Sequence, residues 1–210
     1  MEAAAGNPMD LTGATVLVAG ASGGIGREIA ILLSPLHARV APSGRCRERR
    51  QQTRARLCGE GRRMDVFDLL RTNLHSAILL ARGFRQKHCH ATGSGMVLLS
   101  SVMGLVGTPM VSVYSGTKSA LMGFARSLAV ELANQRIRVN CSAPAFVRTE
   151  MLGQVKAMLS PERFAALEKA HPLGFGTPRD LANAVAFLLA DTGRWITGST
   201  LVVDGGHSAQ

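Results

Sequence analysis

The sequence predicts an α/β fold in which helices flank a doubly wound parallel sheet. Short apolar runs of strand length alternate with longer runs whose apolar residues recur at helical spacing. Three glycines, Gly20, Gly24 and Gly26, separate the first such strand from the first such helix. The 210 residues match the size of one ordinary α/β domain, so we expect a single domain over residues 1–210.

Composition narrows the class of protein. Apolar residues make up 46% of the chain, yet no apolar run reaches the roughly 18–20 residues that span a bilayer. The first eight residues lack the basic and apolar stretches of a signal peptide, so a cytoplasmic protein without a membrane partner is expected. The four cysteines form no Cys-x-x-Cys pair and are expected to be reduced thiols. Adjacent side chains rarely converge on one ion, so no metal site is expected at His-Cys-His, residues 88–90.

The net charge of +10 is concentrated in one segment. Residues 39–63 hold nine arginines and two glutamates. Such a cluster is typical either of a solvated face or of a protein that binds a polyanion. The chain has one Tyr, one Trp and no nucleic-acid-binding motif, so nucleic acid is not expected as a partner and polyanion binding remains the lesser alternative.

The N-terminal elements predict a nucleotide-binding turn. Residues 14–19 read as a strand, and the helix that follows the glycines covers residues 27–36. Between them, backbone N–H groups and the helix N-terminus could approach a pyrophosphate. A tight turn without a ligand is the alternative. The expected contacts are Gly20, Ser22, Gly24, Ile25 and Gly26.

The middle of the chain is expected to contain two further strands and two helices. A second strand covers residues 38–43, and Pro42 is expected to end it early because proline cannot donate to a ladder. A helix over residues 51–57 and a third strand over residues 63–66 precede a long helix, Phe67 to Phe84.

The second half of the chain predicts a strand over residues 95–101 that ends in two serines, a helix over residues 114–132 and a strand over residues 136–141. The variable stretch 150–178 contains a short helix over residues 161–170 and is expected to cover the substrate, although its apolar residues suit core packing equally well. Thr177 is expected to cap a helix that runs to Leu189, and an edge strand closes the chain at residues 199–206.

Tyr114 and Lys118 are the candidate catalytic pair. Residues four apart lie on one face of a helix, so the phenol and the ammonium group can share a site. A cation nearby favours the phenolate and would lower the phenol pKa from about 10. A half-buried aromatic residue beside a solvated charge is the alternative for an isolated pair.

The Gly-x-x-x-Gly-x-Gly turn and the Tyr-x-x-x-Lys pair together resemble the short-chain dehydrogenase/reductase family, especially its 3-oxoacyl-(acyl-carrier-protein)-reductase-like members. The resemblance covers residues 11–44 and 67–206 and implies a Rossmann-type fold. It implies an NAD(P)-dependent oxidoreductase that acts on a small carbonyl or secondary-alcohol substrate. Family members commonly form dimers or tetramers through two long helices, so a homo-oligomer is expected.

The resemblance also assigns roles in catalysis. Tyr114 would act as general acid and base, and Lys118 would lower the phenol pKa and bind the cofactor ribose. Ser101 would orient the carbonyl oxygen, with Ser100 a weaker candidate. Asn73 would support Lys118 through water.

Further residues bear on the cofactor. Val147 and Thr149 lie in a stretch that resembles the family's nicotinamide-binding loop, where Ala145 replaces the usual glycine. Thr149 could equally cap a helix. No acidic residue follows the second strand, whereas Arg45 suits a 2′-phosphate, so NADP(H) is favoured over NAD(H), with a generic solvated arginine as the alternative.

The chain departs from the family before Asn73. Only 47 positions separate Gly26 from Asn73, too few for the usual elements since one βαβ unit takes about 30 residues. The expected fold therefore lacks one central strand-helix unit, strand 4 of the order 3-2-1-4-5-6. Residues 64–66 would fill that place or leave a gap between strands 1 and 5. Low stability and a non-catalytic or impaired nucleotide-binding relative are the corresponding alternative.

Overall fold

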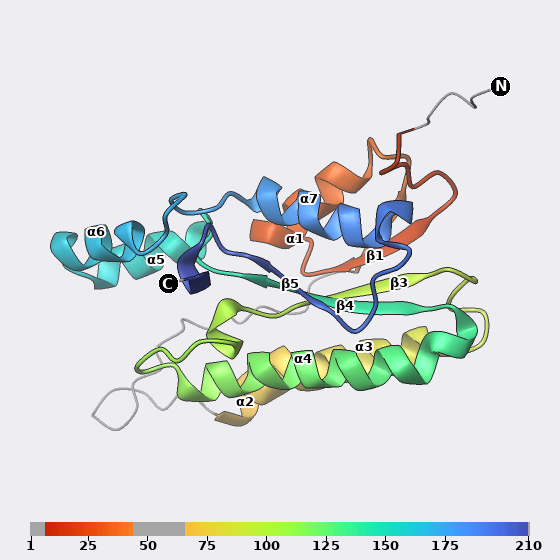
Figure 1. The fold of residues 1–210 in the computed structure, drawn as a ribbon, viewed down its shortest axis with the longest axis horizontal. Coiled ribbons are helices and arrows are strands. Elements are labelled where there is room, and N and C mark those ends of the chain that lie inside the picture. The colour runs from red at the N-terminus through yellow and green to blue at the C-terminus, as the bar shows by residue number, and fades with distance from the viewer. Residues whose placement is uncertain (1–6, 44–65, 210) are drawn as a thin grey trace. The chain divides into compact units, whose positions relative to one another are not determined.

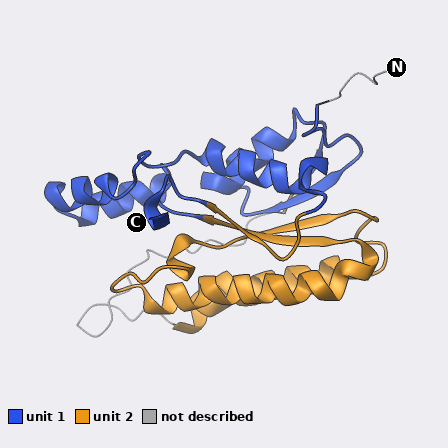
Figure 2. Ribbon diagram, in the orientation of Figure 1, with its two compact units in different colours: residues 1–49, 144–195, 203–210 blue, residues 50–143, 196–202 orange. Residues whose placement is uncertain are grey.

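The computed structural model describes residues 7–43 and 66–209. They form two compact units, shown in Figure 2. Unit 1 comprises residues 1–49, 144–195 and 203–210, and unit 2 comprises residues 50–143 and 196–202. The single domain over residues 1–210 stays a prediction.

Unit 1 begins with a parallel strand pair joined through a helix (Figure 1). Strand β1 (Thr15–Ala19) pairs in parallel with β2 (Arg39–Ser43), from Thr15 opposite Arg39 to Ala19 opposite Ser43. Pro42 does not end β2 early, contrary to the expectation. Among the described residues β2 has a partner on one side only, and an edge strand tolerates a residue without an N–H group.

Helix α1 (Gly24–Leu33) packs against helix α7 (Pro178–Leu189) within unit 1. The apolar residues of α1 recur at helical spacing and bury Ile29, Leu32 and Leu33. Arg179 of α7 donates to Glu28 of α1 at 3.0 Å, but this ion pair is partly exposed and contributes about 1 kcal/mol at most.

The start of α7 confirms the expected cap. Thr177 Oγ1 accepts from Asp180 N, and the Asp180 carboxylate accepts from Thr177 N, which forms a capping box. These contacts satisfy N–H groups that the first helical turn leaves without an intrahelical acceptor.

The variable stretch forms two helices, α5 (Glu150–Met158) and α6 (Pro161–Lys169). Ser160 caps α6, since its Oγ accepts from Arg163 N at 3.4 Å. Of the apolar residues here, Leu152 is buried, whereas Met151 and Met158 are exposed.

Unit 2 contains most of a sheet with the order β3-β4-β5. Its strands are β3 (Gly95–Leu99), β4 (Arg138–Pro144) and β5 (Thr200–Val203). β3 and β4 are parallel, from Gly95 opposite Arg138 to Leu99 opposite Ser142. β4 is buried along nearly all its length, as expected for the middle strand.

Two long helical segments of unit 2 carry its core. The first runs through α2 (Val66–Leu70), a π-helical turn η1 (Arg71–His75) and α3 (Ser76–Phe84). The second is α4 (Ser112–Leu132). Their apolar faces and the sheet share one hydrophobic core, whose buried members are Ala81, Leu98, Leu121, Met122, Ala125, Leu128, Ala129, Leu132, Ile137, Val139, Cys141 and Ala143.

Short 3₁₀ turns complete the described chain: η2 (Val102–Gly104), η3 (Ala133–Gln135), η4 (Asp191–Gly193) and η5 (His207–Ala209). No helix in the described part of the chain is long and apolar enough to cross a membrane.

The pairing of the described strands does not contradict the expectation of a missing unit. Over residues 7–43 and 66–209, β1 pairs only with β2, and β3 pairs only with β4. Val66 is the first residue of α2, so the third strand expected over residues 63–66 is wrong at its last residue, and residues 63–65 lie outside the described ranges. The helix expected over residues 51–57 also lies outside them.

Candidate active site

Helix α4 places Tyr114 and Lys118 one turn apart, as predicted. Lys118 Nζ lies 5.6 Å from the centroid of the Tyr114 ring. It also donates to the carbonyl oxygen of Leu99, the last residue of β3, at 2.9 Å. Lys118 therefore links the carboxyl end of β3 to the face of the phenol.

The two serines that follow β3 have different partners. Ser101 caps η2, since its Oγ accepts from Met103 N at 3.3 Å, and its side chain also hydrogen-bonds to Tyr114. The Ser100 hydroxyl donates to the carbonyl oxygen of Lys118 at 2.7 Å. This arrangement favours Ser101 as the serine beside the phenol, because the hydroxyl of Ser100 holds helix backbone.

Asn73 lies in the middle of the π-helical turn, and its side chain contacts Thr117 of α4. Asn73 Nδ2 donates to Thr117 Oγ1 at 3.0 Å. A π-helical turn holds one residue more than an α-helical turn and often marks a functional site. The structure thus brings Asn73 to α4 one residue before Lys118.

Burial controls the titration of the pair. Burial raises the pKa of the Tyr114 phenol above 10, and the hydrogen bond from Ser101 opposes that rise. The net direction is opposite to the lowering expected from Lys118. Burial also lowers the pKa of Lys118 to about 8, and the Cys141 thiol acts against this shift. The burial of both groups disfavours their charged forms.

The predicted glycine turn lies in unit 1 and needs its glycines. Gly20 and Gly24 have positive φ angles of +78° and +53°, a backbone conformation that residues with a Cβ atom disfavour. A Cβ atom on Gly26 would overlap the Gly20 carbonyl oxygen, so the third glycine permits α1 to start close to the end of β1. Nothing lies within 4 Å of a Cβ atom built on Gly20 or Gly23, so the turn leaves room for an anion at the N-terminus of α1.

The other residues expected at this turn are accessible to different degrees. Ser22 is exposed and Ile25 is half-buried. A Cβ atom built on Gly24 would lie 3.7 Å from Thr149 Cγ2, so Thr149 borders the turn. Arg45 lies outside the described residues.

Val147 and Thr149 follow β4 within unit 1. Val147 forms an isolated parallel bridge with Gly176. Thr149 precedes α5 but makes no side-chain cap, and its hydroxyl donates to Val147 O at 3.3 Å. Ala145 is not among the residues with positive φ, so replacing the family's glycine causes no backbone strain there.

Sequence reasoning missed two residues of unit 2 that bear on the turn of α4 carrying Tyr114 and Lys118. Thr117 is buried and contacts both Asn73 and the Tyr114 carbonyl. A Cβ atom on Gly104 would lie 2.8 Å from Ser119 N and 3.0 Å from the carbonyl carbon of Lys118, so η2 packs directly on the backbone of α4. The sequence signals these contacts of Thr117 and Gly104 only by placing the two residues close to Tyr114 and Ser101.

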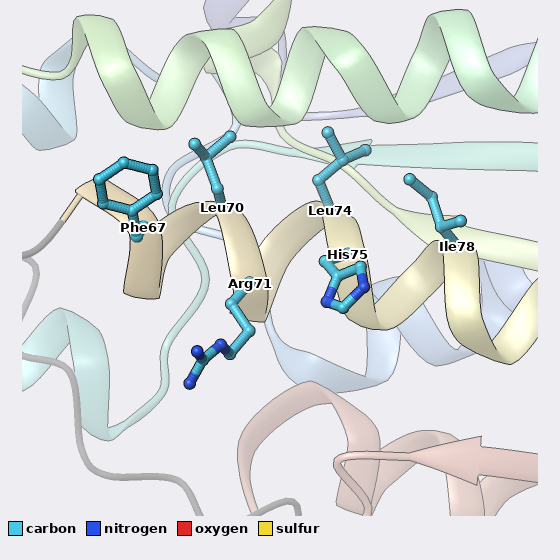
Figure 3. Close-up of a pocket in the computed structure, with 6 residues that line it drawn as sticks. All are labelled: Phe67, Leu70, Arg71, Leu74, His75 and Ile78. Atoms are coloured by element: carbon cyan, nitrogen blue, oxygen red, sulfur yellow. The ribbon is translucent and has the colours of Figure 1, made fainter.

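A shallow hollow of about 370 Å³ runs along the first helical segment of unit 2 (Figure 3). Its lining side chains are Phe67, Leu70, Arg71, Leu74, His75 and Ile78. None of them belongs to the predicted catalytic set, so the hollow is not the candidate active site. Among residues 7–43 and 66–209, no three His, Cys, Asp or Glu side chains gather as metal ligands.

Comparison with known proteins supports the family assignment. The family model described as Enoyl-(Acyl carrier protein) reductase matches residues 56–208. The 3-oxoacyl-(acyl-carrier-protein) reductase FabG of Rickettsia felis is 31% identical over an alignment of 240 positions, covering 94% of this chain and 98% of that protein. The human 3-oxoacyl-(acyl-carrier-protein) reductase is 41% identical over 143 residues, which are 68% of this chain and 56% of that protein.

The alignment with the Rickettsia protein is longer than the 210 residues of this chain, so at least 30 of its positions have no counterpart here. That difference agrees with an internal deletion. A Beutenbergia cavernae protein whose crystal structure contains NADP at low occupancy has a TM-score of 0.82 and 26% identity, with 97% of this chain and all of that chain covered. The fold is therefore Rossmann-like, and the chain belongs to the NAD(P)-dependent short-chain dehydrogenase/reductase family.

Proposed function

We propose that the protein transfers a hydride between NADP(H) and a carbonyl or secondary-alcohol substrate, with Tyr114 as general acid and base. The observation that carries this proposal is the arrangement of unit 2, in which Ser101 hydrogen-bonds to Tyr114 and Lys118 Nζ lies 5.6 Å from the ring of Tyr114. A general acid needs a proton at the operating pH. The raised pKa of Tyr114 keeps the phenol protonated near neutral pH, ready to protonate a developing alkoxide.

The other members of the set would prepare the reacting oxygen. The Ser101 hydroxyl would donate to the substrate carbonyl oxygen and hold it beside the phenol. Lys118, with a pKa of about 8, would be mostly protonated at pH 7 and would offset the negative charge left on Tyr114 after proton transfer. Asn73 would support Lys118 through a water molecule, from the neighbouring helical segment.

The glycine turn of unit 1 is proposed to hold the pyrophosphate of the dinucleotide. Its positive-φ glycines, its unobstructed backbone and the N-terminus of α1 suit a pyrophosphate. NADPH, when bound, supplies the hydride. Thr149 and Val147, with Ser22 and Ile25, are the proposed further contacts of the cofactor. Arg45 is proposed to select the 2′-phosphate, and the Arg45→Ala variant should weaken NADPH binding far more than NADH binding.

The names of the relatives suggest the substrate class. Both the Rickettsia and the human proteins are called 3-oxoacyl-(acyl-carrier-protein) reductases. We therefore choose a 3-oxoacyl thioester as the test substrate and follow NADPH consumption. The Tyr114→Phe variant should lose at least about 100-fold in kcat while its NADPH dissociation constant stays close to that of the wild type. Near-wild-type turnover by a folded Tyr114→Phe protein would refute the mechanism.

A second candidate function is cofactor binding with impaired turnover. It is favoured by the strand pairing over the described residues, in which β1 pairs only with β2 and β3 pairs only with β4, because the strand expected to be missing would pair with both β1 and β3. The two candidates give different results in one titration. Tight NADPH binding without turnover of any 3-oxoacyl thioester would support the second, whereas turnover that saturates with NADPH supports the first.

A homo-oligomer is the proposed assembly. Exposed apolar side chains on the two long helical segments of unit 2, among them Ile78, Leu79, Leu80 and Val130, support it. Val130 is 80% exposed. Light scattering should give a mass above that of one chain, and the Val130→Glu substitution should lower it. A monomeric mass for the wild type at micromolar concentration would contradict the proposal.

A further inference from the structure

Thr117 connects Asn73 with the Tyr114–Lys118 turn, two parts of the proposed catalytic set that lie far apart in the sequence. It lies on α4, three residues after Tyr114 and one before Lys118, and is 2% exposed. Its hydroxyl donates to the carbonyl oxygen of Tyr114 at 2.7 Å, and its oxygen accepts from Asn73 Nδ2 at 3.0 Å. One buried hydroxyl therefore joins the π-helical turn to the turn of α4 that holds the pair.

The two hydrogen bonds also fix the orientation of the Asn73 amide. A threonine hydroxyl has one hydrogen, and here it is used on the Tyr114 carbonyl. Thr117 Oγ1 can then only accept from Asn73, which requires the NH₂ group of Asn73 to face Thr117 and its Oδ1 to face away. If Thr117 lost its hydroxyl, the amide could turn over or swing away from α4.

We propose that Thr117 is a positioning residue of the active site, which holds Asn73 in one amide orientation against the Tyr114–Lys118 turn of α4. This inference rests on the proposed function for its kinetic readout. Thr117 does not touch the reacting atoms. It acts through Asn73 and through the backbone of Tyr114.

The expected kinetic effect follows from the sensitivity of reaction rates to small displacements of active-site groups. Loss of the Thr117 hydroxyl releases Asn73 and removes one restraint on the Tyr114 backbone, and a misplacement of about 1 Å can cost about 100-fold in rate. The Thr117→Val variant should lose about 10- to 100-fold in kcat with KM nearly unchanged. Thr117→Ser keeps the hydroxyl and should restore most of the rate. Thr192→Val is the matched control, because Thr192 also donates to a helix carbonyl, Phe187 O at 2.8 Å, but in unit 1.

A double-mutant cycle separates positioning from general destabilisation. If Thr117 acts through Asn73, Thr117→Val should cost little further rate in an Asn73→Ala background. A purely structural role of Thr117 would instead lower the rate by the same factor in both backgrounds. Additive losses would therefore overturn the proposal.

A second readout does not need turnover. Tyr114 is the only tyrosine of the chain, so the ultraviolet absorbance of the phenolate reports this residue alone. In Thr117→Val, the released Asn73 side chain should swing away from α4, let water reach the phenol and move the Tyr114 midpoint down toward 10, the value of an unperturbed phenol, whereas Thr117→Ser and Thr192→Val should leave it unchanged. Thr117→Ala replaces the valine variant if that variant does not fold.

The outcomes distinguish the two proposals. A wild-type protein without NADPH-dependent turnover would overturn the proposed function, and the tyrosine titration would still decide on Thr117. Normal wild-type turnover with an unchanged rate and an unchanged Tyr114 midpoint in Thr117→Val would overturn the role of Thr117 alone.

Discussion

Replacing Gly104 by alanine is expected to disturb the turn of α4 that carries Tyr114 and Lys118. The new Cβ atom would lie 2.8 Å from Ser119 N and 3.0 Å from the carbonyl carbon of Lys118. Both neighbours are helix backbone, which cannot rotate away as the end of a side chain can. Ordinary van der Waals contact begins at 3.4 Å, so η2 and α4 must separate by about 0.6 Å.

The cost can be estimated from that separation. Forcing extra atoms into a packed region costs about 1–3 kcal/mol. For a domain of this size, 1 kcal/mol corresponds to about 2–4 °C, so the melting temperature should fall by about 2–12 °C. Because the displaced backbone belongs to Lys118, kcat should also fall by about tenfold, within the range expected for sub-ångström misplacement.

Gly107→Ala is the matched control for this substitution. Gly107 lies three residues further along the same connection, and no heavy atom lies within 4 Å of a Cβ atom built there. Its free energy of unfolding should change by no more than about 0.5 kcal/mol. Calorimetric melting of both variants and steady-state turnover provide the test. If Gly104→Ala melts and turns over like Gly107→Ala, the inferred close packing of η2 on α4 is incorrect.

Three further predictions concern stability. The pKa of Lys118 is about 8 in the folded protein, below its ordinary 10.5, so the unfolded chain binds more protons between pH 8 and 10.5 and this group makes stability rise with pH there, by at most about 1.4 kcal/mol per pH unit. Denaturant unfolding at several pH values should show a weaker pH dependence of the unfolding free energy in Lys118→Met. The raised pKa of Tyr114 acts in the opposite direction and makes stability fall above about pH 10. Thr177→Ala should cost about 0.5–2 kcal/mol in urea unfolding through loss of the capping box, and an unchanged midpoint would contradict that cap. Leu132→Ala, at a fully buried position, should cost about 2–5 kcal/mol, while Leu173→Ala, at an exposed one, should stay within about 0.5 kcal/mol, and equal losses would count against the assigned core.

Much of the fold could be predicted because its signals are local. The spacing of Leu121, Ala125, Leu128 and Leu132 marks the buried face of α4, and the structure confirms a helix that ends at Leu132. Thr177 followed by proline predicted the start of α7. Apolar periodicity and capping chemistry act over a few residues, so they can be read without tertiary information.

The features that were missed depend on tertiary context. Pro42 was expected to end a strand, but its effect depends on whether that strand has one neighbour or two. The π-helical turn at Asn73 adds one residue to a helical turn and has no compositional signature. The raised pKa of Tyr114 depends on burial, which the spacing of Tyr114 and Lys118 does not reveal.

The candidate site was predictable as motifs but not as contacts. Tyr114 and Lys118 were chosen from their spacing and Ser101 from the resemblance to the family, and unit 2 brings the three together. The partners of Asn73 and Ser100 could not be predicted in this way. Their hydrogen bonds, to Thr117 and to the Lys118 carbonyl, join segments that are 44 and 18 residues apart in the chain.

The packing of α1 against α7 affects how the protein can fold during its synthesis. The two helices are separated by 144 residues, 34–177. At about 5–20 residues per second, a ribosome needs about 7–29 s to make the intervening chain. Until then Ile29, Leu32 and Leu33 lack the helix that covers them in the finished protein. The N-terminal strand-helix-strand is thus synthesised long before α7, and its apolar helix face stays exposed during that interval. Chaperones that bind exposed apolar helices can engage it in that time.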